Sequence, residues 1–517
     1  MTGIAKTHSP DYILYNGNFI TMNPEQEHCN IITIQDGKIT GTFDSYAESF
    51  SRGFHSRMID LKGKTVLPGF IDCNVHLIQS GLQKYCIEVY TDTKESFLQK
   101  LQKEASEFKD GEWVWCVGYN DEIEDLTRWD LDKISPNHPI VISKNEFHIT
   151  IVNTLAYRLL QIPRSVSGTS RNADGVPTGV LAGEASGFAR RKLFMNLIDD
   201  NLREKILQQM DYELIANGIT TVNAMEGGPF FADQDIDAVN RYKSSSMTEI
   251  LLFPQTMMVD TVLEKSLPRI GGNIYLDGSI GAKKAAITDN YVGDTQNGTL
   301  YYSQEDVDDF ILNAHKRGLQ ISVSCIGNRA INQALHAFQK AFYAEGMKNH
   351  RHRIELFVMP DKEQINLAIA LGLILSMRPN YDKLNGGAEG IYKKNIGELH
   401  KNCNPLASVV QRGGILCCGS EHSVTPLNPF VSISSCVLHS EPKERLTVYE
   451  ALQTLTVNAA YANFAEERIG KIQRGFDADL IAVSEDPFTA APEDIENIRT
   501  IMTMKKGKIL YHERGLI

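Results

Sequence analysis

The chain has 517 residues, so a single small sandwich or helical bundle is excluded, and a large barrel with appendages is expected. Its 52 basic and 64 acidic residues give a net charge of −12, which argues against nucleic acid as a partner. The longest apolar run, residues 367–375, is too short to cross a membrane. The first residues lack the apolar segment of a signal peptide, so the nine cysteines are expected to be reduced thiols and the location cytoplasmic.

Both ends of the chain have the pattern of short strands joined by tight turns. Near the start, Asn16-Gly17 and Asp36-Gly37 each lie between alternating apolar and polar residues, which predicts two hairpin turns. Lys506-Gly507 predicts another hairpin near the end. Neither end has enough strands to be stable alone, so we expect residues 1–65 and 458–517 to form one composite β-sandwich.

The middle of the chain, residues 66–457, alternates apolar strand-like runs with segments of helical periodicity. This alternation predicts an α/β fold, and its length favours a distorted (β/α)8 TIM barrel over an open sheet. No glycine-rich nucleotide-binding motif is present. Residues 80–190 are less regular, and we expect them to be an insertion that caps the barrel mouth.

Several segments together resemble one known family. TVLPGFIDCNVHL at 65–77 is similar to the first barrel strand of the amidohydrolase superfamily. Further segments follow the order of its YtcJ-like branch, the relatives of N-substituted formamide deformylase: DGVPTGVL, YLDGSIGAKKAA, SCIGNRAINQAL, RIEL, GSEHSVTPLNP and RGFDADLIAVSEDP. The resemblance spans nearly the whole chain and implies a metal-hydrolase-type barrel.

The resemblance also implies where metal ligands would lie, and most of those positions hold other residues. Asn74 stands where the family has the first histidine of a His-x-His pair, and His76 matches the second. The remaining four positions hold Asn273, Cys325, Leu356 and Glu421 in place of lysine, two histidines and aspartate. Leucine cannot bind a metal and asparagine is a weak ligand, so a binuclear centre is not expected.

A reduced site is the alternative that these replacements leave. His76, Cys325 and Glu421 are suitable ligand types, and three protein ligands are usual for a catalytic zinc ion. We therefore expect either no metal or one divalent ion, zinc by preference, held by these three residues. The same three are the predicted catalytic residues, with Glu421 as the general base.

Four residues are predicted to contact a small-molecule substrate. His148 and Asn153 match a pocket histidine and asparagine of the resembled group, while Asn74 and Asp277 lie near the predicted mouth. Asp277 has an alternative interpretation as a turn residue.

Three functions are compatible with the sequence. The first is hydrolysis of an amide-type or cyclic C–N bond with at most one metal ion. The second is metal-independent condensation, cyclisation or lyase chemistry on the same fold. The third is binding or regulation without catalysis, since a fold does not determine a function. A homodimer is the default expectation for the oligomeric state.

Overall fold

The structure is a computed structural model that describes residues 11–45, 57–91, 93–119, 126–144, 149–228, 232–422 and 424–515. The chain divides into two compact units, each described here by itself. The large unit comprises Met1–His76, Met210–Met225 and Lys243–Ile517, and the small unit comprises Leu77–Gln209 and Glu226–Tyr242. Within the described ranges, no helix is both long and apolar enough for a membrane span.

The two ends of the chain build one eight-stranded sheet in the large unit. Its order is β22-β21-β20-β5-β1-β2-β3, with β4 also paired to β1. The strands are β1 (Tyr12–Ile20), β2 (His28–Gln35), β3 (Lys38–Phe43), β4 (Arg57–Asp60), β5 (Thr65–Pro68), β20 (Leu480–Val483), β21 (Thr500–Lys505) and β22 (Lys508–His512). The antiparallel pair β5–β20 joins the two ends, and apolar residues of both ends share one core.

Two of the three predicted hairpin turns are correct. Asp36-Gly37 connects β2 to β3 and Lys506-Gly507 connects β21 to β22, with positive φ at all four residues. The prediction for Asn16-Gly17 is wrong, because these residues lie inside β1 as an irregularity. There Asn16, at φ 54°, allows β1 to change its parallel partner from β4 to β5.

Eight further strands of the large unit form two arcs. One arc has the order β14-β13-β6, and the other has the order β15-β16-β17-β18-β19. They are β6 (Phe70–Val75), β13 (Ile219–Glu226), β14 (Glu249–Pro254), β15 (Arg269–Tyr275), β16 (Gln320–Cys325), β17 (Arg353–Leu356), β18 (Ile374–Met377) and β19 (Leu416–Cys418). Pairing is parallel between β6 and β13 and throughout the second arc.

Hydrogen bonds link the arcs at both seams, as in a distorted eight-stranded barrel. At one seam, His76 N donates to His422 O at 3.2 Å and Glu421 N donates to Asn74 O at 2.8 Å. At the other, the Gln255 side-chain amide donates to Asn273 O at 2.8 Å. Parallel strands place their carboxyl ends together, so residues there are candidates for function.

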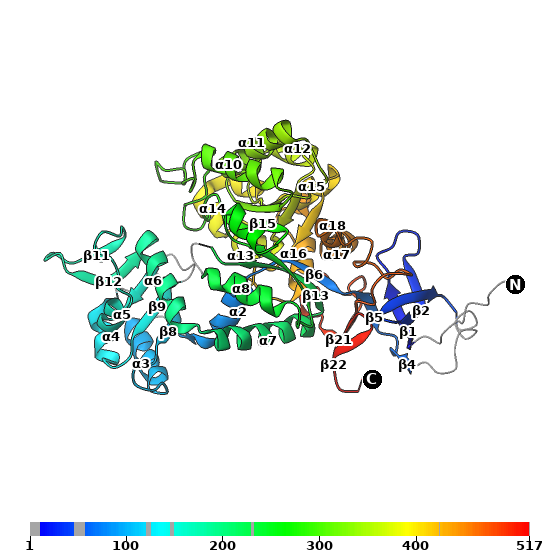
Figure 1. Ribbon diagram of the computed structural model, residues 1–517, viewed down its shortest axis with the longest axis horizontal. Helices are drawn as coiled ribbons and strands as arrows, with labels where there is room; N and C mark the ends of the chain where they lie inside the picture. Colours follow the sequence, from blue (N-terminus) through cyan, green and yellow to red (C-terminus); the bar gives the residue numbers. More distant parts are fainter. Residues whose placement is uncertain are drawn as a thin grey trace. The chain divides into compact units, whose positions relative to one another are not determined.

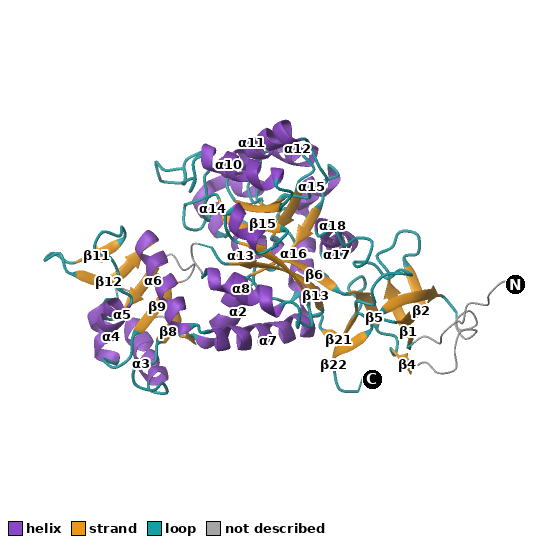
Figure 2. Cartoon of the chain, in the orientation of Figure 1, coloured by secondary structure: helices purple, strands orange, loops and turns teal. Residues whose placement is uncertain are grey.

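Helices cover the outside of these strands (Figure 2). They are α9 (Val259–Glu264), α10 (Gln304–Lys316), α11 (Asn328–Glu345), α12 (Lys362–Ala370), α13 (Pro379–Asn385), α14 (Ile391–Ile396), α15 (Leu406–Gln411), α16 (Pro429–Val437), α17 (Val448–Thr454) and α18 (Val457–Ala462), with 3-10 turns η3 (Gly397–Asn402), η4 (Pro442–Glu444) and η5 (Ile495–Asn497). Helix α11 buries one apolar stripe that includes Ala334, Phe338 and Phe342, which is why it packs on the strands.

The small unit has its own sheet and core (Figure 1). The sheet order is β11-β12-β10-β9-β8-β7. Its elements are α2 (Leu77–Leu82), η2 (Gln83–Tyr85), β7 (Ile87–Glu88), α3 (Lys94–Ala105), β8 (Val114–Tyr119), α4 (Arg128–Ile134), β9 (Ile140–Lys144), β10 (Ile149–Val152), α5 (Thr154–Leu159), β11 (Thr169–Arg171), β12 (Pro177–Ala182), α6 (Gly183–Leu197) and α8 (Asp233–Tyr242), while α7 (Asp200–Ala216) contributes to both units. The segment expected to be an irregular cap is therefore an ordered α/β unit with a buried core.

Candidate active site

The carboxyl ends of the barrel strands gather most of the predicted site residues. Asn74 lies in β6 and His76 follows it, while Asn273 lies in β15 and Cys325 ends β16. Glu421 lies just after β19. Two residues that sequence reasoning did not select, Glu355 in β17 and Arg378 directly after β18, also lie at this end.

Glu355 is the centre of a buried ion network. Its carboxylate lies 2.8 Å from Arg353 Nη2 and 2.6 Å from Arg378 Nη2, and all three side chains are fully buried. Ser322 Oγ donates to it at 2.8 Å and Asn74 Nδ2 at 3.2 Å. Burial alone would raise the pKa of Glu355, but the two guanidinium groups outweigh it and hold that pKa below its usual value.

Arg378 connects this network to Glu421. Its Nη1 donates to the Ser376 and Met377 carbonyl oxygens at 3.0 and 2.9 Å, which fixes the plane of the guanidinium. Its Nε lies 3.5 Å from Glu421 Oε2, an ion-pair distance without a hydrogen bond. The pKa of Arg378 is raised, since Glu355 and Glu421 outweigh the effect of burial.

Glu421 receives two neutral donors as well as this cation. Tyr381 Oη donates to Oε2 at 3.0 Å and Asn273 Nδ2 donates to Oε1 at 3.2 Å. Burial nevertheless raises the pKa of Glu421 above its usual value, although Arg378 opposes the shift. A carboxyl group with a raised pKa exchanges its proton closer to neutral pH, which suits acid–base chemistry.

Strained backbone marks three of the positions where the resemblance places metal ligands. Asn273, Leu356 and Glu421 have φ values of 68°, 70° and 51°. For a bulky residue such as leucine this left-handed region is unfavourable, and it persists only where the surrounding structure enforces it. Backbone strain of this kind concentrates at functional sites, so these positions are candidates for function.

The other predicted catalytic residues are buried and uncharged. His76 Nδ1 is 2.7 Å from Met225 O, and burial together with Arg378 lowers the His76 pKa to about 4. The nine cysteines are free, and burial followed by the charge of Asp277 raises the pKa of Cys325 well above its usual value. At neutral pH, Cys325 is therefore a thiol rather than a thiolate nucleophile.

Asp277 is held by the backbone. Its carboxylate accepts from Ile326 N at 2.9 Å and from Gly327 N and Ala286 N at 2.8 Å. Burial raises the pKa of Asp277 to about 7, although these three donors oppose the shift. The residue joins the loop after β15 to the loop after β16 through donors 9, 49 and 50 positions away, rather than through a local turn.

Two substrate-binding residues were predicted in the small unit, Asn153 and His148. Asn153 caps α5 by accepting from Ala156 N at 2.8 Å, and it also accepts from Ile140 N and donates to His138 O. These contacts account for its complete burial without a ligand. His148 lies outside the described residues.

The donor set at this end does not fit a metal ion. Over the described ranges, no group of three or more His, Cys, Asp or Glu side chains is arranged to hold one. Glu421 already contacts a guanidinium, a phenol and an amide. The buried charge of Arg378 would repel a divalent cation beside it. His76, Cys325 and Glu421 are therefore not assembled as the metal site that the sequence allowed.

The missed residues had a signal in the sequence. Arg353, Glu355 and Arg378 are charged residues within or directly after short apolar strands, where an uncompensated charge would be costly. Each therefore required a partner of opposite charge in the same core. The sequence does not say which residues those partners are.

Comparisons with known proteins identify the family. A model described as the amidohydrolase family matches residues 57–511. The chain is 26% identical to the protein LONG AFTER FAR-RED 3 of Arabidopsis thaliana, over 97% of this chain and 91% of that protein. It is 22% identical to N-substituted formamide deformylase of Arthrobacter pascens, over 98% of this chain and 100% of that enzyme.

A solved structure shows the same fold. The crystal structure of an uncharacterized metal-dependent hydrolase from Pyrococcus furiosus superposes with a TM-score of 0.77 at 23% identity. The superposition covers 92% of this chain and 100% of that one. The fold is thus shared between the two chains.

Proposed function

Because this chain belongs to the amidohydrolase family, we propose that it cleaves an amide-type or cyclic C–N bond of a small molecule without a bound metal ion. The bond type is supported by the family and by the relative whose name describes a formamide deformylase. The absence of a metal step is supported by Arg378, whose fixed positive charge lies among the positions where ligands were expected.

The observation that carries the proposal is a set of three unused hydrogen-bonding atoms. Asn74 and Asn273 each commit their Nδ2 atom to a carboxylate, which orients both amides. Their Oδ1 atoms are buried and have no hydrogen-bond partner among the described residues, and the same holds for Arg378 Nε. Two free acceptors and one free donor complement the N–H and C=O groups of an amide, a ureide or a cyclic imide.

The chemistry follows from these atoms. An N–H of Arg378 directed at the carbonyl oxygen would stabilise the negative charge that develops there, because the group is oriented before the reaction. Glu421 would take a proton from the attacking water and return it to the leaving nitrogen as the C–N bond breaks. His76 is neutral at neutral pH and adds no charge to the site.

The test combines metal analysis with two variants. The protein is purified without chelators, analysed for metals, and screened on amides, formamides and cyclic imides with and without a chelator. We expect turnover that chelation does not reduce. Glu421→Gln should then lower the rate by about 10²–10⁴-fold, as loss of an acid–base group does, whereas Cys325→Ser should change it far less.

Each opposing result identifies another function. Loss of activity on chelation would contradict metal independence, and full activity in Glu421→Gln would contradict the role of that residue. Ligand-dependent shifts in melting temperature without any turnover would favour a binding or regulatory protein. Product formation by condensation or cyclisation would favour the biosynthetic alternative.

A further inference from the structure

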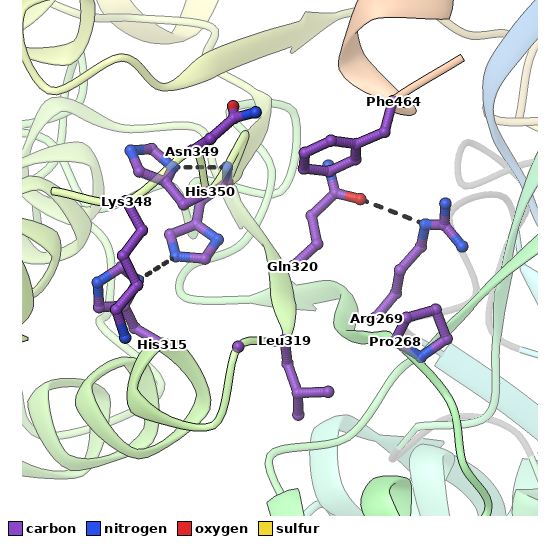
Figure 3. A pocket seen from close by; sticks show the side chains of 11 residues that line it. Pro268, Arg269, His315, Leu319, Gln320, Lys348, Asn349, His350 and Phe464 are labelled. Atoms are coloured by element: carbon purple, nitrogen blue, oxygen red, sulfur yellow. Dashed lines mark hydrogen bonds between the residues drawn. The ribbon is translucent and has the colours of Figure 1, made fainter.

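The large unit has a second candidate site, at the amino ends of the barrel strands. Arg269 is the first residue of β15, Gln320 is the first of β16, and His352 directly precedes β17. They line a cavity of about 220 Å³ together with Pro268, His315, Leu319, Lys348, His350 and Phe464 (Figure 3). Because the strands are parallel, this cavity lies at the opposite strand ends from Glu421 and Arg378.

The charged side chains that line this cavity are all basic. Among the described residues that line it, two are cationic, three are histidines and none is acidic. In the described part of the chain, no carboxylate lies within 4.0 Å of Arg269 or Lys348. Arg269 Nε donates to Gln320 Oε1 at 3.2 Å, a neutral partner that leaves the charge uncompensated.

The carboxylate of Glu249, which acts on Arg269 electrostatically, is already paired. Glu249 lies 2.6 Å from Arg468 and 3.4 Å from Lys505, so two other cations share its charge. Burial and the neighbouring Arg353 lower the pKa of Arg269 to about 10, which is the response of a guanidinium in a positive environment. An anion bound beside it would remove this unfavourable interaction.

The walls of the cavity add an apolar face. Phe464 is exposed to 46% and has φ 59°, an unfavourable conformation for an aromatic residue. Arg351 lies over its ring at 4.3 Å, which holds the ring in place. Leu319 and Pro268 extend the apolar lining. The lining therefore combines apolar side chains with two positive charges.

We propose that this cavity binds a small organic anion, a phosphate monoester or carboxylate with a flat apolar part, between Arg269, Lys348 and the ring of Phe464. The site is separate from the strand ends that carry Glu421, so the proposal does not depend on the proposed reaction. Guanidinium and ammonium groups are the usual donors to phosphate and carboxylate, and an aromatic wall supplies the contact for the rest of the ligand.

Binding of phenyl phosphate, benzoate and inorganic phosphate to the full chain is measured by calorimetry, with benzyl alcohol as the neutral probe. We expect saturable 1:1 binding of the two aromatic anions, weaker binding of inorganic phosphate, and no binding of benzyl alcohol. The preference between phenyl phosphate and benzoate distinguishes phosphate from carboxylate ligands. Equal binding of benzyl alcohol, or no binding of either aromatic anion, would overturn the proposal.

Three variants separate the contributions. Arg269→Gln and Lys348→Gln should each weaken phenyl phosphate binding about tenfold or more, as loss of a charged hydrogen bond does. Phe464→Gly, which suits the positive φ, should weaken phenyl phosphate but leave inorganic phosphate unchanged. Lys362→Gln, an exposed lysine that does not line the cavity, is the matched control and should have no effect. Unchanged affinity in both Lys348→Gln and Arg269→Gln would contradict the assignment.

Discussion

The carboxyl and amino ends of the barrel strands differ in whether their cationic side chains have a carboxylate partner. At the carboxyl ends, fully buried Arg378 lies 2.6 Å from Glu355, whose carboxylate is also paired at 2.8 Å with buried Arg353, the first residue of β17. At the amino ends, Arg269 and Lys348 have no carboxylate within 4.0 Å in the described ranges. The ion pairs at the carboxyl ends need no ligand to balance their charge. The cations at the amino ends are available to a ligand. The cations around Glu355 are therefore neutralised by a carboxylate of the chain itself, whereas Arg269 and Lys348 are not.

The largest expected effect comes from removing Arg378 from the ion network at the carboxyl ends of the strands. Arg378→Leu should lower the free energy of unfolding by about 3–5 kcal/mol, because it leaves buried Glu355 and Glu421 without their shared cation. Thermal and denaturant unfolding measure it. Arg412→Leu, at an exposed arginine, should change stability by less than about 0.5 kcal/mol. Adding Glu355→Gln should restore part of the loss, and no restoration would show that packing rather than charge was lost.

Asp277 tests a second buried contact set at the carboxyl ends. Asp277→Ala removes the acceptor of three backbone N–H groups and should cost about 2–4 kcal/mol in unfolding free energy. Asp294 also accepts two backbone N–H groups, but in an exposed turn. Asp294→Ala should therefore cost less than about 1 kcal/mol, since water replaces the lost contacts. Equal losses in the two variants would show that burial does not matter at Asp277.

The histidines at the amino ends predict acid sensitivity. His315 Nδ1 is 2.8 Å from His352 Nε2, and the rings of His350 and His352 stack at 4.4 Å. Burial lowers the pKa of all three, that of His350 to about 4. The unfolded chain then binds more protons between pH 6.5 and 4, so stability is complete above pH 6.5 and is lost as the pH falls.

A variant isolates the histidine contribution to this pH dependence. His350→Phe keeps a ring that can stack on Phe342, now 4.4 Å away, but cannot titrate. Acidification should lower its melting temperature less steeply than it lowers that of the unmodified chain. The difference corresponds to at most one proton that the unfolded chain binds and the folded chain does not. Melting curves at pH 4.5–7.5 measure the two proteins side by side.

Carboxyl groups with a raised pKa, such as Asp277, have the opposite effect on the pH dependence. Their contribution to stability is lost as the pH rises towards about 7.

The smallest effect on stability is expected at the amino ends of the strands, where the cations have no ion pair. Lys348→Gln should leave the free energy of unfolding within about 0.5 kcal/mol of its original value, because an exposed cation without an ion pair contributes little. The same melting experiments measure it beside Arg378→Leu. A loss comparable with that of Arg378→Leu would remove the distinction between the two ends.

Local sequence signals predicted much of the architecture. Asp36-Gly37 and Lys506-Gly507 form hairpin turns, because such a turn requires positive φ only at its two adjacent central residues. Asn16-Gly17 has the same signal but lies within β1, because Tyr15 O and Asn16 O accept from Leu61 N and Gly63 N of a distant segment. Asn153 likewise caps a helix and contacts the small unit's own backbone. In both cases tertiary partners determined the outcome.

The sequence by itself determined the family and the α/β class, because these depend on residue identity and order along the chain. Only the tertiary structure decided which buried polar and charged side chains meet at the strand ends. Asn74 and Glu355, 281 positions apart, meet across the barrel, and Arg378 joins Glu355 to Glu421. Such pairs have no local periodicity or spacing. They arise because each buried charge must find its partner when the strand ends come together.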